Sequence, residues 1–217
     1  MSTTLSGVTD IARAAIHAVT TSELLNTVKF AVTDKAATIL HTGSSGLVDD
    51  LRILVWMDQE NSLRGSVSQT CKAALAVSES TNFVTAHPGD DIRDNHTGLP
   101  IRFVEPIRFI EPGLNGHAAA TSDDVVHSNG VPFISPVHAL VETIIDCPWL
   151  PEAQVDAAVG EAENLCNVAL RSQNQPTRNG QLTLTEHQYI AILWNLDRFT
   201  RLSAFPSLHW FYLFRLV

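Results

Sequence analysis

The sequence is poor in cysteine and has no long apolar run. Its three cysteines, Cys71, Cys147 and Cys166, are too few and too scattered for a disulfide framework or a cysteine-rich metal site. No apolar stretch approaches the roughly 20 residues that a membrane-spanning helix needs, so we expect no membrane partner. The first residues lack the basic and apolar regions of a signal peptide. We therefore expect a cytoplasmic protein.

Basic residues are also scarce. The chain has 14 lysines and arginines against 23 aspartates and glutamates, which gives a formal net charge of −9. Without a basic excess to attract phosphates, general nucleic-acid binding and membrane-surface binding are not expected. A local basic pocket is compatible with this net charge. Hydrophobic residues make up 45 % of the 217 residues, which is enough to build a sizeable core.

The order of predicted elements favours an α/β domain followed by helices. Helical spacing is found over residues 8–29 (with a break near 20–23), 36–40, 67–78, 137–146, 152–171 and 185–196. Strand patterns occupy residues 30–32, 50–56, 83–85, 99–105 and 107–110. Residues 87–98 and 112–129 are predicted to be loops. The expected organisation is an α/β domain over residues 1–147 and a helical extension over 148–217.

The acidic pair Asp49 and Asp50 gives the strongest indication of a site. It follows a turn of small residues, 43–46, and enters a β-branched and aliphatic run. Carboxylates at the start of a buried strand are costly unless they are paired or bind a metal. Side chains two residues apart on a strand face the same way, and the residue two places after Asp50 is Arg52. A metal-binding pair would need a second acid there.

Four segments, in this order and spacing, resemble the nucleotidyltransferase-like superfamily, especially its small bacterial and fungal members. They are residues 32–44, 48–55, 98–104 and 130–140. The resemblance extends over roughly residues 8–147. It implies a mixed sheet flanked by helices, with a helical C-terminal part.

The departures from this family lie where its chemistry occurs. The family's metal-binding carboxylates correspond to Asp50, which is retained, to Arg52 and to Arg102. Its phosphate-approaching glycines correspond to Thr33-Asp34 or Asp34-Lys35, residues that lack glycine's conformational freedom. Exchanging two carboxylates for two guanidinium groups changes the charge of the ligand set by about four. The resemblance therefore implies a pseudoenzyme with a degenerate motif and no metal cofactor.

Three interpretations of this cleft remain open. Asp50, Arg52 and Arg102 can form an ion-pair cluster that replaces the metal site. They can instead form a pocket, with Lys35 and Ser44 at its rim, that binds a small anionic ligand or nucleotide through the arginines, or binds a protein partner. The third interpretation is an active Mg²⁺-dependent nucleotidyltransferase in which Asp50 and Asp49 are catalytic, with Glu105 as a third carboxylate.

Two other segments are noted. The loop that contains His87, Asp90, Asp91, Asp94 and His96 is rich in metal-capable side chains, but its spacing fits no metal motif, so we expect a solvated acidic loop. The C-terminal residues 202–217 are rich in aromatics. They either pack into the core or bury against a second copy, in which case the protein is a structural subunit that forms a homodimer.

Overall fold

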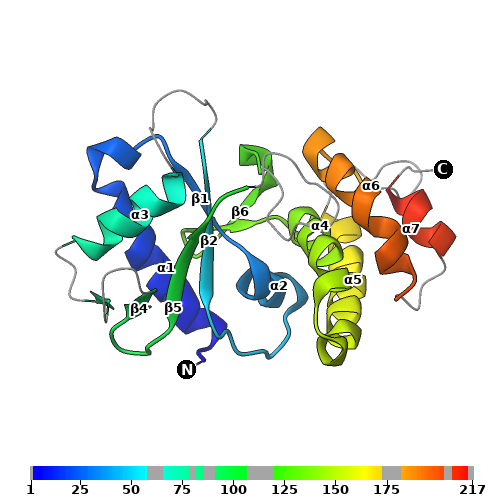
Figure 1. The fold of residues 1–217 in the computed structure, drawn as a ribbon, viewed down its shortest axis with the longest axis horizontal. Helices are drawn as coiled ribbons and strands as arrows, with labels where there is room; N and C mark the ends of the chain where they lie inside the picture. Colours follow the sequence, from blue (N-terminus) through cyan, green and yellow to red (C-terminus); the bar gives the residue numbers. More distant parts are fainter. Residues whose placement is uncertain are drawn as a thin grey trace. The chain divides into compact units, whose positions relative to one another are not determined.

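The computed structural model of the protein describes residues 2–57, 66–78, 82–85, 91–106, 120–172, 182–202 and 207–214. The chain forms two compact units, Met1–Pro106 with Thr121–Ile134, and Ile107–Ala120 with Ser135–Val217 (Figure 1). The sequence predicts an α/β domain that continues to Cys147. In the structure, helix α4 (Pro136–Asp146) belongs to the second unit.

The first unit is built on a mixed sheet. Its described strands are β1 (Lys29–Val32), β2 (Leu51–Trp56), β3 (Phe83–Val84), β4 (Ile92–Asp94), β5 (Pro100–Val104), β6 (Val125–Ser128) and β7 (Val131–Ile134). These seven strands are arranged in the order β3-β4-β5-β2-β1-β7-β6. The β2–β5 and β1–β7 pairs are parallel and the other neighbours are antiparallel. The prediction of a mixed α/β sheet is confirmed.

Helices pack on this sheet within the first unit. They are α1 (Leu5–Thr20), α2 (Asp34–Thr42) and α3 (Val67–Ala76), with short 3₁₀ turns η1 (Glu23–Leu25) and η2 (Ser122–Asp124). In Figure 1, α1 and α3 lie on one side of the strands and α2 on the other. Helix α1 buries an apolar stripe at helical spacing, which includes Val8, Ile11, Ala15 and Val19. It ends at Thr20, the break expected from the sequence.

The central strand β2 lies in the core of the first unit. Ile53, Leu54 and Val55 are fully buried, so both faces of the strand are covered. Burying one such side chain contributes about 1.5–3 kcal/mol. This continuous apolar run fixes the strand in place, and the polar residues at its beginning are therefore held in a defined position.

Two short strands lie where loops were expected. Strand β4 falls within residues 87–98, and β6 falls within residues 112–129, so both loop predictions were wrong in part. Strand β6 forms a hairpin with β7 through Asn129 and Gly130, whose φ angles of 50° and 76° suit a two-residue turn between antiparallel strands. The strand expected at residues 107–110 lies outside the described residues.

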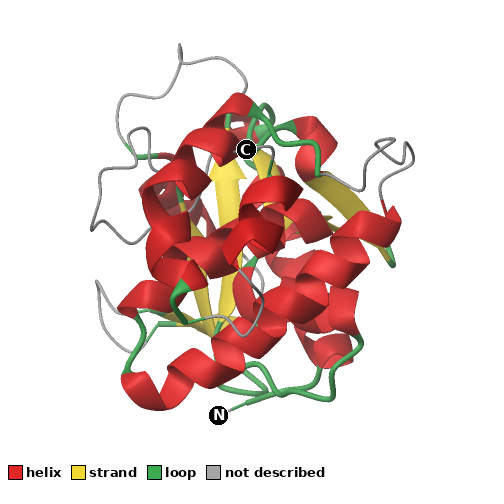
Figure 2. Cartoon of the chain, turned by 90° about the vertical axis from the view of Figure 1, so that its right-hand side faces the viewer, coloured by secondary structure: helices red, strands yellow, loops and turns green. Residues whose placement is uncertain are grey.

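The second unit consists of helices in its described residues (Figure 2). They are α4, η3 (Cys147–Trp149), α5 (Glu152–Ser172), α6 (Glu186–Thr200) and α7 (Ser207–Leu213). Thr185 is the N-cap of α6 and forms a reciprocal capping box with Gln188. None of the helices in the described parts of the chain combines the length and apolar character needed to cross a membrane.

Part of the aromatic C-terminal segment is packed within the helical unit. Trp210 and Phe214 are buried, and the Trp210 ring meets Phe199 of α6 edge to face at 5.1 Å between centroids. The main-chain N–H of Leu182 donates to the carbonyl oxygen of Leu213 at 2.9 Å, which fixes the end of α7. These contacts give the segment a role in the core of its own unit, while Tyr212 is 47 % exposed.

His41 joins the end of α2 to the end of β7. Its Nε2 lies 2.7 Å from the carbonyl oxygen of Ile134. A carbonyl oxygen only accepts, so Nε2 carries the hydrogen and donates it. Burial lowers the pKa of His41 below its ordinary value, and the hydrogen bond to Ile134 opposes part of that shift. The folded protein therefore favours the neutral imidazole.

We expect this histidine to make the protein less stable in acid. Because the pKa is lower in the folded than in the unfolded state, the unfolded chain takes up a proton first as the pH falls below about 6.5. The free energy of unfolding should decrease from that point, until the pH passes below the folded pKa. In the variant His41→Gln, which keeps a donor but does not titrate, urea unfolding between about pH 5 and 8 should show a weaker pH dependence. The same dependence in both proteins would contradict this assignment.

Candidate functional site

Two arginines lie side by side in the sheet. In the parallel pairing of β2 with β5, Arg52 is in register with Arg102. Like charges at directly neighbouring positions destabilise a sheet unless other groups compensate for them. The arrangement therefore requires a carboxylate close to both guanidinium groups.

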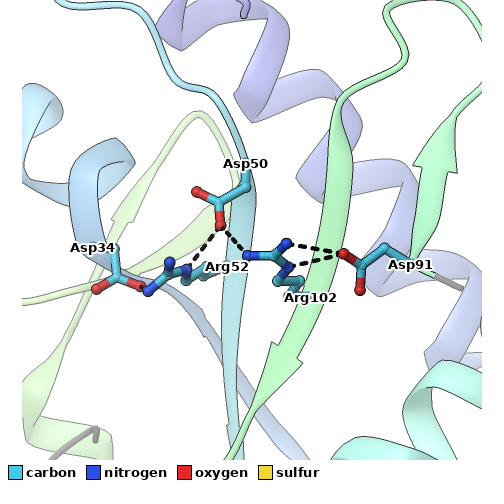
Figure 3. Close-up of polar contacts among 5 residues, drawn as sticks. All are labelled: Asp34, Asp50, Arg52, Asp91 and Arg102. Carbon is cyan, nitrogen blue, oxygen red and sulfur yellow. Dashed lines mark hydrogen bonds and ion pairs between the residues drawn. The ribbon is translucent and has the colours of Figure 1, made fainter. Parts of the chain in front are cut away.

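Asp50 is that carboxylate. Its Oδ2 accepts hydrogen bonds from Arg52 Nε at 2.9 Å and from Arg102 Nη1 at 3.0 Å (Figure 3). Asp50 precedes β2 and lies two residues before Arg52, which places both side chains on the same side of the extended chain. The structure thus brings together the three residues that the sequence analysis placed in the cleft.

Two further aspartates complete the group. Asp34 Oδ2 accepts from Arg52 Nη1 at 3.3 Å, and Asp91 Oδ2 accepts from Arg102 Nε at 3.1 Å and Nη2 at 2.9 Å. The five side chains alternate in charge in the order Asp34, Arg52, Asp50, Arg102, Asp91, and we call them the ion-pair ladder (Figure 3). Their side chains are between 19 % and 43 % exposed, so water still reaches the ladder.

Sheet register explains why the two outer aspartates reach the arginines. Ile92 pairs with Ile101 in the antiparallel β4–β5 ladder, and continuing that register by one residue sets Asp91 opposite Arg102. On the other side, the N–H of Thr33 donates to the carbonyl oxygen of Arg52 at 3.1 Å, which brings the start of α2 next to Arg52. Asp34 is the first residue of α2.

The backbone at Asp34 corrects one expectation. This segment was expected to lack the conformational freedom of the family's glycines, yet Asp34 adopts a left-handed conformation with φ = 55°. Aspartate tolerates this region better than most residues, although the conformation still costs about 1 kcal/mol. The chain therefore makes a left-handed turn of the kind that glycine favours, and this turn carries a carboxylate that bonds to Arg52.

The remaining candidates lie beside the ladder. Lys35 Nζ is 3.5 Å from Asp49 Oδ2, and the Asp49 side chain is 74 % exposed. Ser44 is exposed, and its N–H donates to the hydroxyl oxygen of Thr42 at 3.4 Å. None of these contacts joins Lys35, Asp49 or Ser44 to an arginine of the ladder.

Glu105 is engaged at a helix end. Its Oε1 accepts from the N–H of Ser68 at 2.6 Å and from the hydroxyl of Ser66, the N-cap residue of α3. A carboxylate is favourable at this position because it meets the unpaired N–H groups and the positive end of the helix dipole. Glu105 thus has a structural task at α3.

The side chains of the ion-pair ladder do not fit a divalent metal. A cation bound to Asp50 would lie beside two guanidinium groups that donate to Asp50 Oδ2, at 2.9 and 3.0 Å, and their positive charges would repel it. Hard divalent cations require several oxygen ligands. Within the described ranges, no three acidic, histidine or cysteine side chains converge closely enough to hold a metal ion.

Asp34 and Asp91 are members of the site that the sequence does not predict. In the sequence, Asp34 stands where the family resemblance implies a glycine, and Asp91 lies in a segment predicted to be a solvated loop. Recognition of β4 would have revealed Asp91, because its antiparallel register with β5 predicts the contact with Arg102. Asp94 of the same segment accepts instead from the N–H and hydroxyl of Thr97.

The cysteines do not supply a reactive group. All three are free and buried. Burial raises the pKa of Cys71 to about 12, with a smaller contribution from the negative charge of Glu105. Burial likewise raises the pKa values of Cys147 and Cys166 to about 11, with contributions from Asp146 and Glu163. The thiolate is the nucleophilic form, so these side chains are inert at neutral pH.

Comparison with known proteins identifies the fold. No protein-family model matches the sequence, and no curated protein matches it. The structure is similar to that of an antigenic nucleotidyltransferase-like protein from Paracoccidioides brasiliensis. The TM-score is 0.55 and the sequence identity 13 %, and the similarity covers 93 % of each chain. The protein has a nucleotidyltransferase-like fold, as the sequence predicted.

Removal of the shared carboxylate should destabilise the first unit. In Asp50→Ala, the Arg52 and Arg102 guanidinium groups lose the oxygen between them, and we expect the free energy of unfolding to fall by about 1–3 kcal/mol. The neighbouring Asp49→Ala removes an exposed carboxylate and should change it by less than about 0.5 kcal/mol. Chemical denaturation measures both variants. Equal effects would show that Asp50 does not hold the two arginines together.

Proposed function

We propose that this protein has lost metal-dependent nucleotidyl transfer and binds a small anionic ligand in the cleft where that reaction would occur. The observation that carries the proposal is the ion-pair ladder. Arginine occupies two positions where the family resemblance implies metal-binding carboxylates, and both arginines bond to the remaining aspartate, Asp50.

The electrostatics of the ladder support the loss of transfer. Nucleotidyl transfer uses divalent ions that polarise the triphosphate and activate the attacking hydroxyl. Two guanidinium groups within hydrogen-bonding distance of Asp50 repel such an ion and take one of the two Asp50 oxygens, Oδ2.

The chemistry of arginine supports anion binding. A guanidinium group presents several N–H donors in one plane and binds carboxylates and phosphates through two parallel hydrogen bonds. The side chains of Arg52 and Arg102 are 36 % and 43 % exposed, so a dissolved anion can approach them. Lys35 is also exposed and would contribute positive charge at the rim, together with Ser44 as a hydrogen-bonding group.

The competing function is an active Mg²⁺-dependent nucleotidyltransferase, which is favoured by the retention of Asp50. It would use Asp49 as well, with Glu105 as a third carboxylate. Asp49 contacts Lys35, and Glu105 binds the start of α3, so both would have to leave their present partners.

Two other functions are a protein partner bound at the ladder and a homodimer formed through the C-terminal aromatic segment. Neither would require Asp49 or Glu105 to leave its present partner.

The first test measures transfer. Incubation with Mg²⁺ and each nucleoside triphosphate should release no pyrophosphate, and Asp50→Ala should behave like the unaltered protein. The rival enzyme predicts Mg²⁺-dependent release that is abolished in Asp50→Ala. Crystals soaked with nucleotide and Mg²⁺ provide an independent check, because two bound ions beside Asp50 would refute the proposal.

The second test measures anion binding without a metal. Inorganic phosphate, titrated calorimetrically at low ionic strength, should bind, and Arg102→Gln should weaken binding by at least about tenfold, as loss of a charge-assisted hydrogen-bond pair implies. The matched control is Arg13→Gln. Arg13 also pairs with an aspartate, Asp10, at 2.7 Å in the first unit, but it is not in the ladder. Absence of binding, or equal losses in both variants, would contradict the proposal.

A further inference from the structure

Asp91 occupies the edge of Arg102 that an anion would use. Nε and Nη2 of Arg102 lie along one edge of the guanidinium plane, and both donate to the same oxygen, Oδ2 of Asp91, at 3.1 and 2.9 Å. A carboxylate or phosphate bound in the most favourable geometry uses two oxygens for this edge, one for each nitrogen. Asp91 therefore fills the edge with one oxygen.

We infer that the ligand binds by taking the place of Asp91 on Arg102, and that it is a phosphate-bearing anion. This inference rests on the proposed anion-binding function. It assigns Arg102 as the principal contact and Asp91 as the residue that determines which anions can bind.

The charge balance allows one end carboxylate to leave, and accessibility identifies it as Asp91. Asp34, Arg52, Asp50 and Arg102 contain two negative and two positive side chains and are balanced, and Asp91 adds a third carboxylate. An incoming anion next to all five would face a group with excess negative charge. Of the two end residues, Asp91 is the more accessible, with a side chain that is 36 % exposed against 19 % for Asp34.

Competition with a tethered carboxylate selects the ligand class. A covalently attached group acts at an effective concentration that reaches the millimolar range for short flexible links. A free monocarboxylate can also place two oxygens on this edge, but it has the same charge as Asp91, so replacing Asp91 adds no charge attraction to offset the advantage of the tethered group. A phosphate group carries a charge of about −1.5 to −2 and three strong acceptor oxygens, so it can supply one oxygen to each nitrogen of the edge.

The test compares Asp91→Asn with Asp10→Asn. Both variants remove one negative charge from an aspartate that is paired with an arginine in the first unit, at 2.9 and 2.7 Å respectively. In calorimetric titration with inorganic phosphate, Asp91→Asn should bind about fivefold more tightly than the unaltered protein, the upper range for a partly exposed ion pair. Asp10→Asn should change the affinity by less than about twofold, because salt screens a charge that does not contact the site. Asp91→Ser serves as a second variant if Asp91→Asn does not fold.

Three further measurements make the result specific. The Nε–H resonance of Arg102, followed by NMR, should move on addition of phosphate in the unaltered protein, since the nitrogen exchanges one oxygen partner for another. Acetate should bind Asp91→Asn but not the unaltered protein. A parallel titration with metal-free nucleoside triphosphate distinguishes the sources of phosphate: tighter binding than inorganic phosphate indicates a nucleotide, and equal binding indicates free phosphate.

The outcomes separate this inference from the function on which it rests. If phosphate binds the unaltered protein, binding depends on Arg102, and Asp91→Asn shows no gain over Asp10→Asn, then exchange with Asp91 is wrong while anion binding stands. If neither the unaltered protein nor Asp91→Asn binds phosphate, the proposed function and the inference both fail.

Discussion

Two arginines lie side by side on adjacent strands, and the positions of the surrounding carboxylates depend on this pairing. Backbone hydrogen bonds between β2 and β5 fix Arg52 beside Arg102, and the buried run after Arg52 prevents β2 from sliding. The repulsion between the two guanidinium groups must then be cancelled locally. Asp50 does this with one oxygen, and Asp34 and Asp91 each satisfy the far side of one arginine. The start of α2 and the start of β4 are thereby tied to the central strands by charge.

The pairing of Arg52 with Arg102 also limits which ions this site can bind. Hard divalent cations are bound by several carboxylate oxygens. Here the two arginines contribute +2 to the cleft, and Asp50 alone supplies an acid at the three positions that the family resemblance assigns to the metal. This part of the sheet is consequently organised around guanidinium groups. The proposed recognition of anions follows more readily from this arrangement than metal-dependent transfer does.

The local structure of this site could be predicted from the sequence, but the contacts between residues far apart in the chain could not. Strand β2 and the common direction of Asp50 and Arg52 could be predicted, because both depend on a two-residue period within one strand. The proximity of Arg102 followed only from the family resemblance. Asp91 could not be found in this way, since β4 is three residues long, lies among turn-forming residues and owes its conformation to pairing with β5. Asp34 could not be predicted because it reaches Arg52 from a left-handed backbone conformation, which sequence patterns assign to glycine.

The residues at positions 34, 52 and 102 depend on one another. With glycine at position 34 the backbone would be relaxed, but Arg52 would lose the carboxylate at its far side. With an acid at position 52, three carboxylates would lie together at 34, 50 and 52, which is tolerable only around a bound cation. Arg102, in register with position 52, would then meet that cation directly. A change at one of these positions alone would therefore leave either an unmatched arginine or a crowded acidic group, and a metal site here would require at least the two arginines to change together.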